Sequence, residues 1–505
     1  MRIIKLFFLF YLIAMHTHAQ IQFDKRYPLG LATLGLKVVE IPGGYITVGA
    51  NISDTNIFNN NIIVKTDYYG DTIKTLYLLT HDSVFWSLYN QDPDDNFPDI
   101  IMTSDSNLMV LGRSQAFNPN NTYHYDIWLV KLNFNLDTVW TKSYTHSNTD
   151  TSLIPQSLIQ TNDGGFLICG KQRNLGFTNY YGFLYKVDSA GNFQWYKSYN
   201  NPGPFQAIWD VIELPDHSFM CTGNNINTIN GDLDAFYFYV DSLGNQFAVF
   251  TIPTLGNSAF CELIESNNNS FVMIGSENFS SGSIQPYINS IVKINSTGSI
   301  IWKKNYLPFN SVGSALVVAK ALNGGYIYSG LSDNTTNYVK AYIHRLDENG
   351  DSLWYREFGS SSYSDFWDIK TTSDGGYIMC GQTGGCNNNG GTCFWLVKTD
   401  SLGLLVTGIK EETIFKAATL TVYPNPTTTY CTITATVPQT NNTGAGKKGA
   451  SIILFDMRGK QLLEQPLQTG NNTVQLNLTN YAAGTYLAVL VADGYNVKQV
   501  KVAKQ

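Results

Sequence analysis

The feature that most constrains the fold is a sevenfold repeat that occupies most of the 505 residues. Each copy contains a short apolar strand that ends in glycine, as in Gly164-Gly-Phe-Leu-Ile-Cys-Gly170 and Gly375-Gly-Tyr-Ile-Met-Cys-Gly381. These final glycines recur every 51 to 63 residues and are Gly49, Gly112, Gly170, Gly223, Gly275, Gly330 and Gly381. Four strands fit into each interval, and four strands in a repeat of about 50 residues are typical of a β-propeller blade.

The rest of each repeat supplies an apolar strand, a turn and a strand that often contains tryptophan. One copy reads Asp188-Ser-Ala-Gly-Asn192 and then Trp195-Tyr-Lys-Ser-Tyr199, and the turn glycine permits the positive φ that tight hairpins need. The seventh copy ends at Asp400-Ser-Leu-Gly403 without the last strand, whereas the N-terminal region holds an unmatched one, Phe23-Asp-Lys-Arg-Tyr27. We therefore predict that residues 22–28 complete blade seven and close the ring, which removes the open edges of a linear array.

Composition agrees with an all-β chain. Charged residues make up 14% of the sequence, aromatic residues make up 13%, and there are 43 glycines. This balance favours short strands and tight turns over long surface helices. The net charge is −7 and no basic stripe is present, so the contacts that bind phosphates are lacking and we expect no nucleic-acid partner.

The N-terminus has the pattern of a signal peptide. Arg2 and Lys5 begin it, an apolar stretch runs from Leu6 to Met15, and the small residue Ala19 stands at the expected cleavage site. Residues 1–19 are therefore expected to be removed during export. No segment reaches the ~20 apolar residues that a membrane-spanning helix requires, so we expect no transmembrane helix.

The seven cysteines divide into one close pair and several repeat positions. Cys386 and Cys393 can close a small loop, and in an exported protein this spacing predicts a disulfide. Cys169, Cys221 and Cys380 share one position of the repeat and have apolar neighbours. We expect these three to be buried as small apolar side chains.

Strand order places the short Asp-Gly-Gly and Asp-x-x-Gly turns on one face of the propeller. The longer connections, from second to third strand and from blade to blade, lie on the other face, which we call the long-loop face and where we expect function. Three of its loops combine Asn, Ser and Thr with aromatic residues, a mixture that could stack on sugars and hydrogen-bond to them. They span Ser114–Tyr125, Ser276–Tyr287 and Gln382–Thr392. The alternative is that they are ordinary solvated loops.

Four carboxylates share one position of the repeat, nine residues before the residue that opens the second strand. They are Asp99, Asp210, Glu262 and Asp368. We predict that they lie on the innermost strands near the channel mouth, where such a ring could bind Ca²⁺ or hold an acid for proton transfer. The alternative is that each carboxylate accepts backbone N–H bonds from the preceding loop.

Histidines form a second candidate set. His81, His124 and His146 fall in long-loop-face segments of blades one and two, together with Asp126. Imidazole and carboxylate groups could form a metal site or an acid–base pair. Their spacing matches no metal-binding motif, so polar surface loops are the alternative. The chain has no Gly-x-Ser-x-Gly, P-loop or His-Glu-x-x-His motif.

The tail, residues 420–505, alternates apolar and polar residues in short strands, which predicts a small immunoglobulin-like β-sandwich. It opens with Tyr423-Pro424-Asn425-Pro426 and contains an Asp-x-x-Gly-Lys turn at Gly459. It then carries Gly484-Thr-Tyr486 and a basic last strand, Val497-Lys-Gln-Val-Lys-Val502. These four elements resemble the C-terminal sorting domain of type IX secretion cargo in Bacteroidota.

That resemblance implies recognition of the tail by the type IX secretion machinery at the outer membrane. It also implies removal of the tail near the linker, residues 409–419, with release of the body or its attachment to surface lipopolysaccharide. A plain accessory β-sandwich is the alternative for the tail.

The sequence therefore predicts an all-β chain, with a seven-bladed β-propeller over residues 20–408 and an immunoglobulin-like β-sandwich over residues 420–505. We expect a cell-surface or extracellular protein that binds a glycan or a protein through its long-loop face. The alternatives are an enzyme that acts on extracellular polysaccharide, with long-loop-face carboxylates or histidines as its site, and a structural spacer. Binding is the favoured interpretation, and no residue is assigned a catalytic role.

Overall fold

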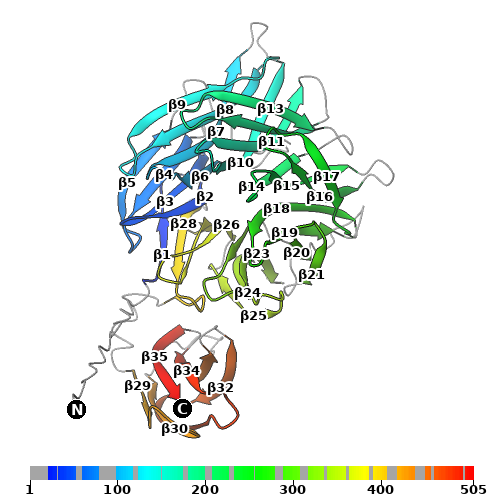
Figure 1. Ribbon diagram of the computed structural model, residues 1–505. Coiled ribbons are helices and arrows are strands. Elements are labelled where there is room, and N and C mark those ends of the chain that lie inside the picture. Colours follow the sequence, from blue (N-terminus) through cyan, green and yellow to red (C-terminus); the bar gives the residue numbers. More distant parts are fainter. Residues whose placement is uncertain are drawn as a thin grey trace, which may run out of the picture.

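The computed structural model describes residues 21–505 apart from residues 31, 53–59, 79–97, 118–122, 149, 175–179, 200–206, 227–231, 255, 279–287, 307–316, 335–337, 360–362, 386–390, 406–417, 438–449, 457–459 and 493–494. Every regular element in the described residues is a β-strand (Figure 1). Accordingly, this part of the chain holds no helix that could span a membrane. The predicted signal peptide and most of the predicted linker lie outside the described residues.

The first four blades comprise β2 (Ala32–Ile41), β3 (Gly44–Ile52), β4 (Asn60–Thr66), β5 (Thr72–Leu78); β6 (Asp99–Met102), β7 (Leu108–Phe117), β8 (Tyr123–Leu132), β9 (Thr138–Tyr144); β10 (Thr151–Gln160), β11 (Phe166–Asn174), β12 (Tyr180–Val187), β13 (Phe193–Tyr199); and β14 (Ala207–Glu213), β15 (Phe219–Ile226), β16 (Leu233–Val240), β17 (Gln246–Thr251). The last three comprise β18 (Asn257–Glu265), β19 (Ser270–Asn278), β20 (Ile288–Asn295), β21 (Ile300–Tyr306); β22 (Val317–Lys320), β23 (Tyr326–Asn334), β24 (Tyr338–Leu346), β25 (Ser352–Phe358); and β26 (Ser364–Thr371), β27 (Tyr377–Gly384), β28 (Thr392–Thr399) with β1 (Phe23–Tyr27).

The described strands before residue 405 form seven four-stranded antiparallel sheets, the blades of a β-propeller. Six blades use four consecutive strands, whereas the seventh has the order β1-β28-β27-β26. β1 pairs with β28 from Phe23 opposite Lys398 to Tyr27 opposite Phe394, and Figure 1 shows the blue β1 beside the yellow β28. The first strand of the chain is thus the outermost strand of the last blade, which joins the two ends of the propeller.

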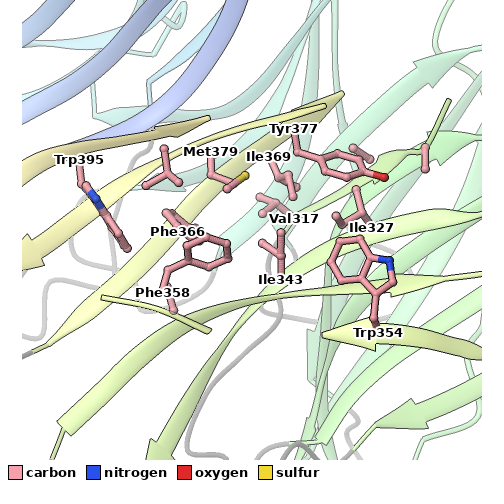
Figure 2. Close-up of a cluster of buried hydrophobic side chains, with 14 residues drawn as sticks. Val317, Ile327, Ile343, Trp354, Phe358, Phe366, Ile369, Tyr377, Met379 and Trp395 are labelled. Atoms are coloured by element: carbon pink, nitrogen blue, oxygen red, sulfur yellow. The ribbon is translucent and has the colours of Figure 1, made fainter. Parts of the chain in front are cut away.

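Apolar layers between neighbouring blades form the core. In the layer between blades six and seven, Val317 and Ile343 of blade six face Ile369 and Met379 of blade seven (Figure 2). Each of these four side chains is buried, and a fully buried aliphatic side chain contributes about 1.5–3 kcal/mol. The alternating apolar residues of the repeat therefore fill the spaces between blades.

The tryptophan-containing outer strand of one blade packs on the Asp-x-x-Gly turn of the next blade, as blades three and four show. A Cβ added to Gly244 would lie 2.7 Å from the ring of Trp195, so only glycine fits beneath that ring. Lys197 Nζ lies 3.1 Å from Asn245 Oδ1, and the Tyr199 hydroxyl donates to the Gly244 carbonyl at 2.8 Å. Gly244 also has φ 78°, which favours glycine. The repeated Trp-x-Lys-x-Tyr pattern therefore encodes contacts between blades.

The C-terminal strands form a small β-sandwich. Its strands are β29 (Thr419–Tyr423), β30 (Tyr430–Val437), β31 (Ala450–Asp456), β32 (Gln461–Leu467), β33 (Gly470–Asn477), β34 (Gly484–Ala492) and β35 (Tyr495–Lys504). One sheet has the order β29-β30-β33 and the other β32-β31-β34-β35. Ile433, Leu454 and Leu490 belong to the apolar core that the two sheets enclose.

Candidate functional site

The four predicted ring carboxylates occupy one structural position. In every blade an inner-strand residue pairs with the residue just before the repeat glycine, and we call this the ring position. Its occupants are Lys37, Asp99, Ser157, Asp210, Glu262, Val317 and Asp368. In five of the blades the pairing shifts register immediately before this residue, which marks a β-bulge. The structure therefore aligns all four carboxylates on the inner strands.

Each ring carboxylate accepts a backbone N–H bond from the inner strand of another blade. The four acceptor–donor pairs, with distances, are Asp99 and Leu158 at 2.9 Å, Asp210 and Leu263 at 2.8 Å, Glu262 and Val318 at 2.5 Å, and Asp368 and Val38 at 2.9 Å. In every pair the donor lies in the next blade around the ring, directly after that blade's ring position. The pair between Asp368 and Val38 joins blade seven to blade one.

Edge-strand chemistry explains this arrangement. An inner strand has a partner on one side only, so its other N–H groups need acceptors when they are buried. Asp99, Asp210 and Asp368 also accept the N–H of the residue that follows each of them in sequence, at 2.8 to 3.0 Å. The alternative interpretation expected donors from the preceding loop. The donors instead belong to inner strands, either the carboxylate's own strand or that of the next blade. We conclude that these carboxylates connect the blades.

Two lysines that the sequence analysis did not single out share the channel. Lys370 Nζ lies 3.1 Å from Asp368 Oδ1 and 3.4 Å from Glu262 Oε1. Burial alone would lower the pKa of Lys37, but the nearby charges of Asp368 and Glu262 raise it above its ordinary value. The channel thus contains ammonium groups that neutralise part of the carboxylate charge.

The ring makes stability depend on pH through Asp210. Burial, together with the charge of Glu262, raises the pKa of Asp210 from 3.8 to about 7. Because ionisation is disfavoured in the folded state, this group should reduce stability progressively as pH rises from about 4 to 7. At 1.36 kcal/mol per pKa unit the effect is about 4 kcal/mol at most. Urea unfolding of wild type and Asp210→Asn across this range should show the stability difference moving in favour of the variant. Parallel pH profiles for the two proteins would contradict this assignment.

The structure brings His124 and Asp126 of the histidine set together. Both are buried on β8, and His124 Nε2 lies 3.3 Å from Asp126 Oδ1. The other Asp126 oxygen accepts the Thr145 hydroxyl at 2.9 Å, and burial raises the pKa of Asp126. Neither ring nitrogen of His124 makes a well-aligned hydrogen bond in the described structure. A buried imidazole beside a carboxylate is an arrangement that can carry a proton.

The other predicted histidines do not join this pair. His81 lies outside the described residues. His146 is half-buried, its Nδ1 accepts the Asn148 N–H at 3.0 Å, and its ring packs on Tyr196 at 5.3 Å. Among the described His, Cys, Asp and Glu side chains, no group of three or more could hold a metal ion.

A polar and aromatic cluster lies at the long-loop end of β26, and the sequence analysis had singled out only its Gln382, at the start of the loop Gln382–Thr392. Asp365 is buried, and its carboxylate accepts the Gln382 side-chain amide at 3.0 Å. Burial raises the pKa of Asp365 to about 6, although hydrogen bonds from Gln382 and Tyr363 oppose the rise. Tyr363 is 43% exposed, and the indole of Trp367 lies beside the carboxylate. We call Tyr363, Asp365, Trp367 and Gln382 the blade-seven cluster.

The cysteines follow the predicted division where they are described. Cys169, Cys221 and Cys380 are free thiols buried in the inter-blade layers. Cys393 is in a disulfide. Its predicted partner Cys386 lies outside the described residues, so the pairing stays a prediction.

The opening and final elements of the tail meet. Asn425 donates from Nδ2 to the Lys501 carbonyl at 2.7 Å and accepts the Ala503 N–H at 2.8 Å, which ties the Tyr423–Pro426 segment to β35. Tyr486 is buried at the start of β34, and its hydroxyl donates to the Ala482 carbonyl at 2.6 Å. Gly459 lies outside the described residues. Tyr423 is 80% exposed and therefore accessible to a partner.

Comparison with known families identifies the tail. Residues 421–505 match the family described as the secretion system C-terminal sorting domain. The predicted type IX sorting domain is confirmed, and it implies interaction with the secretion machinery and export to the cell surface or the extracellular space. No curated protein matches the chain.

Solved structures similar to this chain include glycan-acting enzymes. A polysaccharide lyase, the PL25 ulvan lyase, has a TM-score of 0.47 and 9% identity over 75% of this chain and 96% of its own. The α-L-arabinofuranosidase Arb93A from Fusarium graminearum has a TM-score of 0.44 and 11% identity over 61% and 94%. An arabinanase from Penicillium chrysogenum has a TM-score of 0.42 and 12% identity over 61% and 94%. The function of this chain therefore rests on its own residues.

Proposed function

We propose that this chain is an exported binding module that holds a glycan on the long-loop face of its propeller, at the blade-seven cluster. The observation that carries the proposal is the cluster itself, in which a buried carboxylate and an amide stand beside an accessible tyrosine. Aromatic rings can stack on sugar rings, and fixed polar groups can orient sugar hydroxyls. A protein ligand on the same face is the other outcome that the test below separates.

The ring carboxylates support binding over ring-based catalysis. Asp99, Asp210 and Asp368 each accept at least two backbone N–H bonds, so their oxygens are already used in holding the blades together. A catalytic acid or base must instead come within hydrogen-bond reach of the substrate. This leaves the long-loop face as the surface for recognition.

A second candidate function is hydrolysis or elimination on an extracellular polysaccharide, and the buried pair of His124 and Asp126 favours it. His124 Nε2 and Asp126 Oδ1 lie 3.3 Å apart, so the carboxylate is placed to orient the imidazole. If this pair is catalytic, His124→Ala will abolish product formation and leave polysaccharide binding intact. If the pair is structural, the same variant will lose stability without any change in product.

The first experiment is a melting-temperature survey of the mature chain, residues 20–505, with a panel of polysaccharides and with Ca²⁺ against a chelator. A ligand present at a hundredfold excess over its dissociation constant stabilises a protein by ~2.7 kcal/mol, so even a modest site becomes visible. We expect a rise with at least one polysaccharide. No rise with any glycan would reject the glycan proposal and favour a protein ligand or a spacer role.

A further inference from the structure

The turn that ends blade seven departs from the other six turns at one position. The fifth turn residue is polar in blades one to six, namely Asp71, Asp137, Asn192, Asn245, Ser299 and Asp351. In five of these blades a lysine from the preceding blade reaches it, as Lys25 does to Asp71 at 2.6 Å and Lys304 to Asp351 at 3.0 Å. Blade seven has Leu404 at this position. Blade seven therefore has an apolar side chain at the position where the other six blades have a polar one.

The burial of this turn also differs from that of the blade-four turn, although the first four residues of the two turns are the same. Asp241-Ser-Leu-Gly244 in blade four and Asp400-Ser-Leu-Gly403 in blade seven are the same four residues. The first aspartate of each accepts the N–H of its leucine at 2.9 Å, so the two turns have the same local geometry. Yet Leu243 is 62% exposed and Leu402 only 5%. The difference must come from what lies over the blade-seven turn.

The C-terminal domain covers it. Leu402 forms a buried cluster with Phe455 of β31 and Val489 of β34, and Leu404 packs against this cluster. The neighbouring residues Leu454 and Leu490 of the same strands face the sandwich core instead. Both central strands are therefore apolar on their two faces, which is the pattern of strands that are covered on both sides. We call the side with Phe455 and Val489 the outer face.

We propose that this outer face is a docking surface for the blade-seven turn, so that a non-covalent contact as well as the linker holds the sorting domain on the propeller. This goes beyond the proposed glycan function and does not depend on it. Apolar contact excludes water from both sides, which makes the separation of the two parts unfavourable. While the turn occupies the outer face, no other partner can bind there, and release of the tail requires this contact to break as well as the chain.

The test uses the full mature chain with a protease site inserted within residues 409–417 and cut after folding. Gel filtration should then show the propeller and the sorting domain eluting together. Leu404→Asp places a charge in the apolar contact and should weaken the association at least ~10-fold, equivalent to about 1.4 kcal/mol. Leu243→Asp is the control, because it places the same charge on an exposed leucine of the blade-four turn, the counterpart of Leu402, and it should leave the association unchanged.

Two results would overturn the proposal. The first is that the propeller and the sorting domain of the cut wild type separate as readily as those of the cut Leu404→Asp variant. The second is that Leu404→Asp and Leu243→Asp weaken the association of the two parts equally. Val489→Asp tests the contact from the other side and leaves the propeller sequence untouched. Circular dichroism of each separated part shows whether dissociation occurred with both folds intact, and loss of association with intact folds supports the docking surface.

Discussion

A mature chain that begins at residue 29 instead of residue 20 is expected to lose about 5 kcal/mol of stability. Phe23 and Tyr27 of β1 are each only 7% exposed, and burying such a side chain contributes about 1.5–3 kcal/mol. The Tyr27 hydroxyl also donates to the Gly70 carbonyl at 2.6 Å, and Trp395 donates to Asp24 at 2.6 Å. Without β1, the edge of β28 is open to pairing with other chains.

Thermal unfolding and light scattering of the truncated chain measure this effect, and aggregation is expected to accompany the loss of stability. A milder version replaces Phe23 and Tyr27 by serine in the full chain. Arg26→Ser is the control on the same strand, because Arg26 is exposed. If the truncated chain melts within a few degrees of the wild type, β1 does not close the propeller in solution.

The second large effect is expected at the ring. Asp368→Ala removes the acceptor for the N–H groups of Val38 and Ile369 and the 3.1 Å partner of Lys370. The two buried N–H groups that lose their acceptor cost about 1–3 kcal/mol each, whereas Lys370 keeps Glu262 as a partner at 3.4 Å. Urea unfolding should therefore show a loss of about 4 kcal/mol.

Two comparisons separate this role from a general effect of substitution. Asp368→Asn keeps an acceptor oxygen and should lose less stability than Asp368→Ala. Asp150→Ala changes an exposed aspartate and should change stability by less than about 0.5 kcal/mol. If Asp368→Ala is as stable as wild type, the carboxylate does not join blade seven to blade one.

Much of the fold could be predicted because each blade repeats the same local chemistry. The Asp-x-x-Gly turns adopt positive φ at Gly191 and Gly244, as the hairpin argument requires. Blade two departs from the rule, because Leu136 takes the glycine position with φ 62°. There the contacts with the neighbouring blade override the local preference of leucine. Sequence alone reveals such a position only through its place in the repeat.

The candidate site was predictable only in part. The ring carboxylates were found because they share a register, but their role depends on donors such as Leu158 and Val38 in other blades. Asp365 has no counterpart in the repeat, and the Gln382 amide that it accepts comes from the neighbouring strand. Contacts between residues distant in the chain do not appear in any local pattern.

The most direct test of the account is calorimetric titration of the polysaccharide that gives the largest melting shift against the wild type, Tyr363→Ala and Tyr355→Ala. Tyr363 is 43% exposed in the blade-seven cluster, and Tyr355 is 50% exposed on the outer strand β25. Loss of a stacking ring at the binding site should weaken affinity at least ~10-fold, or 1.4 kcal/mol. The account predicts that loss for Tyr363→Ala and wild-type affinity for Tyr355→Ala. Equal affinities for all three proteins would contradict a glycan site at the blade-seven cluster.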